Sequence, residues 1–143
     1  MATLAIRGGR ILRSDMTVTE ADVLVDRETG DIVELGAELA GDEELDAHGD
    51  LVMPGLVNAH THVAMTLLRG HADDKPLDAW LREDVWPVEA ALEPADIEAG
   101  AALGILAMIK SGNTTFADMD FVIYRTAQRV VRAGLRACRR SGG

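Results

Sequence analysis

Short apolar stretches separated by turn residues predict β-strands in the first fifty residues, at 3–6, 10–12, 21–25 and 31–35. The first two stretches flank Gly8-Gly9, a dipeptide typical of a two-residue hairpin turn. The last two flank a turn that ends at Gly30. A few short strands bury too little surface to fold well alone. We therefore expect residues 1–50 to be part of a β-sandwich that lacks some of its strands.

The pattern changes after a polar link from residue 36 to 50. The link contains Gly41 and five acidic residues between positions 42 and 50, which makes it the best candidate for a domain boundary. Beyond it, strand-like and helical stretches alternate: strands at 51–53 and 56–62, helices at 77–92 and 94–110, a strand at 114–117, a helix at 122–133 and a strand at 135–138. We expect two domains, residues 1–50 and 51–143.

The helix at residues 94–110 has the clearest limits. Pro94 occupies its first position, Lys110 lies in its last turn, and Gly112 follows its end. The order strand, helix, strand, helix, strand predicts an α/β fold with a parallel sheet. An open doubly wound sheet and a closed (β/α)8 barrel both begin in this order, so the periodicity does not distinguish them.

The composition is that of a soluble globular chain of one domain's length, with 143 residues of which 48% are hydrophobic. The longest uncharged apolar run, residues 99–109, is far shorter than the roughly 20 residues that span a bilayer. The N-terminus also lacks the apolar core of a signal peptide, so we expect a cytoplasmic protein. Cys138 is the only cysteine, which excludes an internal disulfide and a Cys-rich zinc site. Any metal ligands must therefore be His, Asp or Glu.

Acidic residues outnumber basic ones by 24 to 14, which gives a net charge of −10. Such a surface repels nucleic acid and anionic membranes, so neither is expected as a partner. Lys75 and Lys110 are the only lysines among the basic residues. An acidic and lysine-poor composition favours a protein from a high-salt cytoplasm.

Two histidines spaced as H-x-H end the strand-like segment 56–62. Because side chains alternate along a strand, His60 and His62 point to the same face, where two imidazoles can bind one metal ion. The carboxyl ends of parallel strands are also where α/β proteins build their sites. The spacing therefore predicts a divalent metal site at His60 and His62.

Several other polar and aromatic residues are expected to have structural roles. His48 lies in a polar turn and His71 in a loop, so both are interpreted as solvated or capping histidines. Asp118 and Asp120 lie at the carboxyl end of a strand, where hydrogen bonds that cap a loop are the expected role and a role in the site is the alternative. Two aromatic residues are expected in the core, with a lid over the substrate as the alternative: Trp80 and Trp86.

Four segments together resemble the amidohydrolase superfamily: V-M-P-G-L-V-N-A-H-T-H (52–62), A-M-T-L-L-R-G (64–70), W-P-V-E (86–89) and S-G-N-T-T-F-A-D-M (111–119). Within the superfamily the sequence is most similar to the methylthioadenosine and S-adenosylhomocysteine deaminases and their triazine-hydrolase relatives. The resemblance runs from about residue 3 to 138. The H-x-H context is specific for the superfamily, and the second and third segments are specific for this branch to a lesser degree.

The resemblance implies the N-terminal part of a (β/α)8 barrel, preceded by strands of a composite β-sandwich. It implies one divalent metal ion, zinc or else iron, with His60 and His62 as the ligands from the first barrel strand. It also places Glu89 against the ribose hydroxyls of a nucleoside substrate. The implied reaction is hydrolysis of a carbon–nitrogen bond by metal-activated water, as in deamination of methylthioadenosine or S-adenosylhomocysteine.

The same resemblance implies an incomplete catalytic set. The family takes a third histidine ligand, a proton-shuttling Glu and His, and a metal-binding Asp from later barrel strands. We therefore expect no catalytic residue in this chain and an incomplete barrel of about two and a half β/α units, inactive alone, as in a truncated product or a fragment. A non-catalytic metal-binding remnant and a triazine- or guanine-type aminohydrolase stay open as alternatives, and so does a homo-oligomer.

Overall fold

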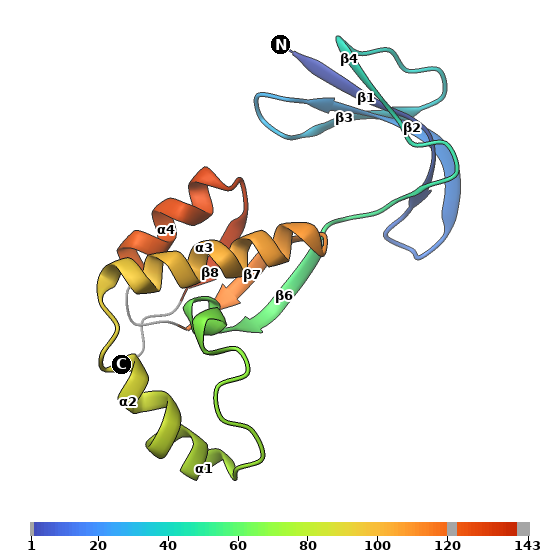
Figure 1. Ribbon diagram of the computed structural model, residues 1–143. Helices are drawn as coiled ribbons and strands as arrows, with labels where there is room; N and C mark the ends of the chain where they lie inside the picture. Colours follow the sequence, from blue (N-terminus) through green and yellow to red (C-terminus); the bar gives the residue numbers. More distant parts are fainter. Residues whose placement is uncertain (1, 120–122, 140–143) are drawn as a thin grey trace. The chain divides into compact units, whose positions relative to one another are not determined.

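The computed structural model describes residues 2–119 and 123–139. The chain divides into two compact units, Met1–Pro54 and Gly55–Gly143 (Figure 1). Within the described residues, no helix combines the length and the apolar character needed to cross a membrane.

The first unit is a five-stranded sheet in which β3, β2, β1 and β4 are neighbours in that order, and β5 also pairs with β1. Its strands are β1 (Thr3–Leu12), β2 (Val18–Asp26), β3 (Ile32–Gly36), β4 (Glu43–Asp46) and β5 (Leu51–Val52). The pairs β1–β2 and β2–β3 are antiparallel, whereas β4 and β5 run parallel to β1. The apolar side chains buried here include Ala5, Ile11 and Val23.

The hairpin turn expected at Gly8-Gly9 is wrong. Strand β1 runs through both glycines and pairs with β2 on either side of a β-bulge between Ile6 and Gly9. Gly8 has a φ of +71°, a left-handed conformation that glycine adopts without strain. Its N–H donates to the carboxylate of Asp22 on β2 at 2.8 Å. The chain reverses instead at residues 13–17, where the N–H of residue 13 donates to the carbonyl of residue 17.

The acidic link expected from residue 36 to 50 contains a strand, β4. It pairs in parallel with Leu4–Arg7 of β1 although all four of its residues are exposed. Its carboxylates face arginines, because Glu44 accepts from Arg7 at 3.2 Å and Glu43 pairs with Arg27. Such a strand has no apolar alternation, and for that reason the hydrophobic pattern did not predict it.

The second unit contains a parallel sheet with strand order β6-β7-β8, as the alternation of strands and helices predicted. Its strands are β6 (Leu56–Thr61), β7 (Asn113–Asp118) and β8 (Arg136–Arg139). Its helices are the 3-10 helix η1 (Val63–Leu68), α1 (Leu77–Ala79), the π-helix η2 (Trp80–Val85), α2 (Trp86–Glu89), α3 (Pro94–Lys110) and α4 (Ile123–Arg132) (Figure 1).

Helix α3 begins and ends where the sequence predicted. Glu93 caps it, and the side chain of Asp96 accepts from the Glu93 backbone N–H at 2.9 Å. Gly112 follows its end with a φ of +78°. The core of the unit joins η1, α3, β7 and α4 through Val63, Ala101, Ile105, Met108, Phe116 and Val130. This core holds the sheet and η1 together at the carboxyl end of β6.

Candidate metal site

The two imidazoles of the H-x-H motif lie together at the carboxyl end of β6. His60 is on the strand, and His62 is the residue between β6 and η1. Their ring centroids are 5.5 Å apart, with an angle of 65° between the ring planes. A zinc ion about 2.0–2.1 Å from one nitrogen of each ring would hold the two centroids roughly 5 Å apart. The spacing therefore fits two imidazoles that share one metal ion.

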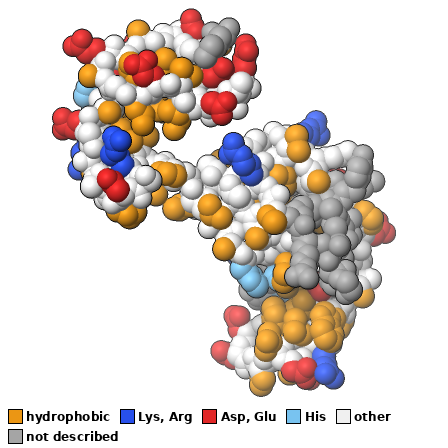
Figure 2. Space-filling view, turned by 180° about the vertical axis from the view of Figure 1, so that it is seen from behind, with side chains coloured by type: hydrophobic (Ala, Val, Ile, Leu, Met, Phe, Trp, Pro, Cys, Tyr) orange, Lys and Arg blue, Asp and Glu red, His pale blue; other side chains and the backbone are white. Residues whose placement is uncertain are grey.

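Both histidines are reachable from solvent. His60 is exposed and His62 is half-buried, and histidine side chains reach the surface of the second unit in Figure 2. Nitrogen donors of this kind suit zinc and other divalent transition metals. The chemistry of the donor pair therefore fits the metal that the sequence predicted.

Both polar groups of the peptide bond that follows His62 are held by hydrogen bonds. Its carbonyl accepts from the N–H of Met65 at 3.0 Å, which forms the first turn of η1. The next N–H, that of Val63, donates to the carboxylate of Asp118 at 3.0 Å. Asp118 ends β7 and is only 1% exposed. The loop-capping role expected for Asp118 is confirmed, while Asp120 lies outside the described residues.

The ligand set around this pair is small. Across residues 2–119 and 123–139, no three or more His, Cys, Asp or Glu side chains form a group that could hold a metal. Catalytic zinc sites use three protein ligands. His60 and His62 therefore supply two of the donors that such a site requires.

The other two described histidines have structural surroundings. The side chain of His48 in the first unit is 75% exposed, and its Nδ1 lies against the carboxylate of Asp46. His71 is exposed, and its carbonyl accepts from the indole N–H of Trp80 at 3.4 Å. Both match the solvated or capping roles expected for them.

Glu89 ends a helical run that is separate from the histidine pair. The structure places it half-buried as the last residue of α2. Pro87 does not interrupt the run, because α1, η2 and α2 follow one another directly. The N–H of Trp86 donates to the carbonyl of Leu81, five residues earlier, so the wider turn of η2 directly precedes Pro87, the second residue of α2.

The two tryptophans of this run differ from the expectation that both belong to the core. Trp86 is 51% exposed, and Trp80 is half-buried. Val85, between them, is 1% exposed and is the buried residue of η2. The irregular turn of η2 therefore directs the valine inward and leaves the larger Trp86 ring largely in solvent.

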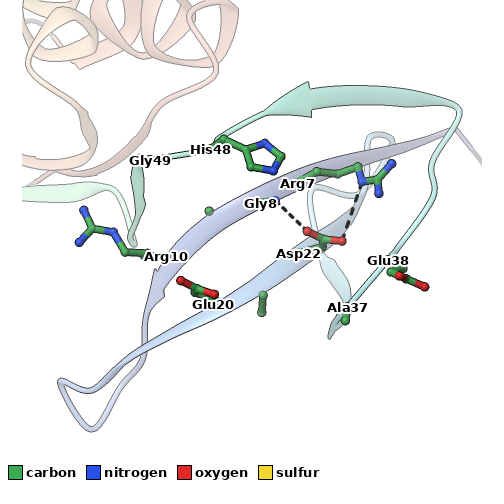
Figure 3. A pocket seen from close by; sticks show the side chains of 11 residues that line it. Arg7, Gly8, Arg10, Glu20, Asp22, Ala37, Glu38, His48 and Gly49 are labelled. Atoms are coloured by element: carbon green, nitrogen blue, oxygen red, sulfur yellow. Dashed lines mark hydrogen bonds and ion pairs between the residues drawn. The ribbon is translucent and has the colours of Figure 1, made fainter.

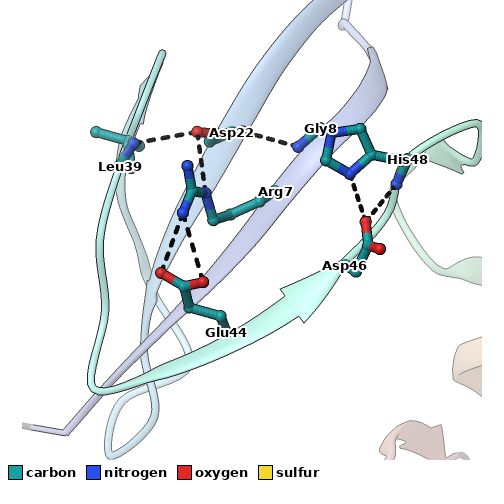
Figure 4. Close-up of polar contacts among 7 residues, drawn as sticks. All are labelled: Arg7, Gly8, Asp22, Leu39, Glu44, Asp46 and His48. Atoms are coloured by element: carbon teal, nitrogen blue, oxygen red, sulfur yellow. Dashed lines mark hydrogen bonds and ion pairs between the residues drawn. The ribbon is translucent and has the colours of Figure 1, made fainter.

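A polar cluster in the first unit was missed by the sequence analysis. Asp22 is 7% exposed and accepts from the N–H groups of Gly8 at 2.8 Å and Leu39 at 3.1 Å, with Arg7 Nε 3.9 Å away (Figure 4). The hydrogen bond from Gly8, followed by that from Leu39 and the charge of Arg7, holds the pKa of Asp22 below its ordinary value despite its burial. An acid followed directly by three apolar residues, in the stretch A-D-V-L-V at 21–25, was the available signal.

This cluster borders a cavity of about 600 Å³, lined among others by Arg7, Gly8, Glu38 and His48 (Figure 3). The imidazole of His48 lies over Gly8, since a Cβ at Gly8 would stand 2.4 Å from it. The carboxylate of Asp22 bridges β1 and the segment after β3. We therefore interpret the cluster as a structural one that stabilises the bulge of β1.

Comparison with known proteins finds that residues 51–142 match the model of the Amidohydrolase family. The chain is 59% identical to a 5-methylthioadenosine/S-adenosylhomocysteine deaminase of Halobacterium salinarum, covering 94% of this chain and 31% of the relative. It is 60% identical to the protein of the same name from Haloarcula marismortui, covering 96% and 32%. The chain thus spans about a third of the length of the curated relatives that it matches.

The structure is similar to that of an adenosine deaminase from Xanthomonas campestris solved with bound zinc. The TM-score is 0.87 at 36% sequence identity, covering 94% of this chain and 32% of the other. The similarity includes both the strands of the first unit and the parallel strands of the second, because nearly the whole chain is covered.

Proposed function

Because this chain belongs to the amidohydrolase family, we propose that it forms part of a metal-dependent hydrolase of carbon–nitrogen bonds that deaminates an adenosine derivative. The chain carries the opening strands of the family's barrel and strands of the flanking sandwich. The observation that carries the proposal is the pair of imidazoles, 5.5 Å apart at the carboxyl end of β6.

In this proposal His60 and His62 are two ligands of one divalent metal ion, and zinc is the first candidate. Zinc is bound in the similar adenosine deaminase from Xanthomonas campestris. When bound, such an ion lowers the pKa of water and so supplies a nucleophile near neutral pH. The chain's own part is to present two imidazole nitrogens from the carboxyl end of β6.

The names of the two halophilic relatives support a 5′-modified adenosine as substrate. Hydrolytic deamination breaks the bond between the purine ring and its exocyclic amine, forms a carbon–oxygen bond and releases ammonia. We assign Glu89 to the ribose end of the nucleoside. A carboxylate has two acceptor oxygens and can accept hydrogen bonds from both hydroxyls of a cis-diol, which favours ribosides over free bases.

Zinc titration of the 143-residue chain tests the metal site. Two imidazoles should bind zinc weakly, and His60→Ala or His62→Ala should reduce the affinity by at least about tenfold. His48→Ala is the matched control, because His48 lies in the first unit on an exposed turn, and it should leave the affinity unchanged. An affinity that does not change in His60→Ala would overturn the proposed site.

A chimera tests the reaction. The chain is joined to the segment of the Haloarcula marismortui relative that it does not cover, and ammonia release from methylthioadenosine is measured. Turnover that disappears with His60→Ala supports the proposal. A chimera that binds zinc and folds but releases no ammonia from any adenosine derivative would favour a non-catalytic metal-binding protein instead.

A further inference from the structure

We infer that Asp118 is a positioning residue for the metal ligand His62, acting through the backbone N–H of Val63. This inference rests on the proposed metal site and adds to it a residue on a different strand, outside the H-x-H motif. The carboxylate of Asp118 accepts from Val63 N–H at 3.0 Å, and both residues are 1% exposed.

The residue that precedes η1 is unusual for a helix start. The residue before a helix normally has a Ser, Thr, Asp or Asn side chain that accepts from the first free N–H groups. In η1 that position is held by His62, whose side chain makes no capping hydrogen bond. Asp118 supplies the acceptor from the neighbouring strand instead, so the imidazole of His62 does not serve as the cap.

Asp118 is a buried carboxylate at the point where β6 and β7 end. A buried charge is strongly unfavourable unless hydrogen bonds compensate for its lost hydration. Asp118 sits at the end of β7, directly opposite Thr61 in the ladder between β6 and β7. The same residue therefore holds the chain before His62 through the ladder and the chain after it through the carboxylate.

Hydrogen bonds to the peptide after His62 restrict the imidazole of His62. The carbonyl of His62 is held by the N–H of Met65 at 3.0 Å, and the following N–H is held by Asp118. With the peptide after His62 fixed, the ψ angle of His62 is fixed as well, and the backbone angles of a residue determine which χ1 rotamers its side chain can adopt. Loss of the Asp118 acceptor should let this peptide rotate, and the imidazole of His62 should then change its position. A metal site is sensitive to such a change, because its ligands must be held to within about 0.5 Å.

The test compares three variants of the 143-residue chain. Asp118→Ala removes the acceptor, and Asp118→Asn keeps an oxygen at the same place. Thr66→Val is the matched control. It removes a hydrogen bond of the same turn, from Thr66 Oγ1 to the Val63 carbonyl at 2.8 Å, and leaves the Val63 N–H unchanged. Each variant is measured by zinc titration and, without metal, by the NMR coupling constants that report χ1 of His62.

We expect Asp118→Ala to weaken zinc binding by about tenfold and to average the χ1 of His62 over several rotamers. Asp118→Asn and Thr66→Val should retain one rotamer and most of the affinity. A single His62 rotamer with unchanged affinity in folded Asp118→Ala would show a purely structural role and overturn the inference. If Asp118→Ala does not fold, Asp118→Asn decides the question. An averaged χ1 of His62 in Asp118→Asn would also overturn the inference.

The two proposals fail in different ways. If zinc binding does not depend on His60, the metal site itself is wrong, and the rotamer measurement still decides the role of Asp118. If zinc binding depends on His60 and His62 but not on Asp118, the metal site stands and the positioning role is wrong.

Discussion

Gly100 of α3 and Ala64 of η1 lie in backbone contact, since a methyl group added at Gly100 would stand 2.4 Å from the carbonyl oxygen of Ala64. One turn later, the same addition at Gly104 would stand 2.8 Å from the carbonyl oxygen of Val63. Because η1 begins directly after His62, these two glycines let α3 approach the segment that leads away from the proposed ligand.

Gly104→Ala should destabilise the chain although alanine is the better helix former. Helix propensity would contribute about 1 kcal/mol of stability. The added methyl group meets the backbone of Val63, which no rotamer change can relieve, and overpacking of this kind costs about 1–3 kcal/mol. We expect a net loss of about 1 kcal/mol in the free energy of unfolding, measured in urea. A gain in stability would show that η1 moves away without strain.

Asp22→Asn should change how stability depends on pH. The pKa of Asp22 is lowered in the folded chain, first by the Gly8 hydrogen bond, from an ordinary value of 3.8. Its carboxylate therefore stabilises the fold above pH 3.8, and this contribution is lost as the pH falls below that value. Thermal melts should show the parent more stable than the variant at pH 7 and the two converging in acid. The exposed Asp73→Asn is the control, and a constant difference at every pH would contradict the prediction.

Salt should raise the melting temperature. The chain carries a net charge of −10, and acidic side chains are spread over the first unit in Figure 2. Salt also screens favourable ion pairs, but pairs such as Arg82 with Asp78 are exposed. The stability lost by screening each such pair is therefore less than about 1 kcal/mol. Screening of the excess carboxylates is the larger effect, since the Debye length falls from about 10 Å at 0.1 M to about 3 Å at 1 M. Equal melting temperatures in low and high potassium chloride would contradict this expectation.

Glu89→Ala should weaken nucleoside binding in the chimera described above. The loss of two charge-assisted hydrogen bonds to the ribose corresponds to about 2–4 kcal/mol, and it should be read in KM for methylthioadenosine. Zinc content should not change. Glu83→Ala is the matched control, because Glu83 belongs to the same helical run and its side chain is 63% exposed. Identical kinetics of Glu89→Ala and the parent would make Glu89 a structural residue.

The 143-residue chain should not deaminate methylthioadenosine by itself. Two imidazoles fall short of the three protein ligands of a catalytic zinc site, and the described residues contain no larger group that could hold a metal. Ammonia release is measured with and without added zinc. Zinc-dependent turnover that disappears in His60→Ala would show that the site is complete in this chain.

Local signals in the sequence determined much of the second unit. The limits of α3 follow from Pro94 at its start and Gly112 after its end, and both act within a few residues. The alternation along β6 placed His60 and His62 together, because two residues are one repeat of a strand. The order of strands and helices determined the parallel sheet, since such connections require crossover helices.

Tertiary structure decided the features that depend on a partner distant in the sequence. By its sequence, the Gly8-Gly9 pair suits a turn and a bulge equally well. The bulge forms because the N–H of Gly8 donates to Asp22 and because β1 continues to pair with β2 beyond Gly9. Strand β4 exists because β1 offers it a free edge and Arg7 neutralises Glu44, neither of which appears in a local pattern. The contact of Asp118 with Val63 joins residues 55 positions apart, and only the pairing of β6 with β7 brings them within hydrogen-bonding distance.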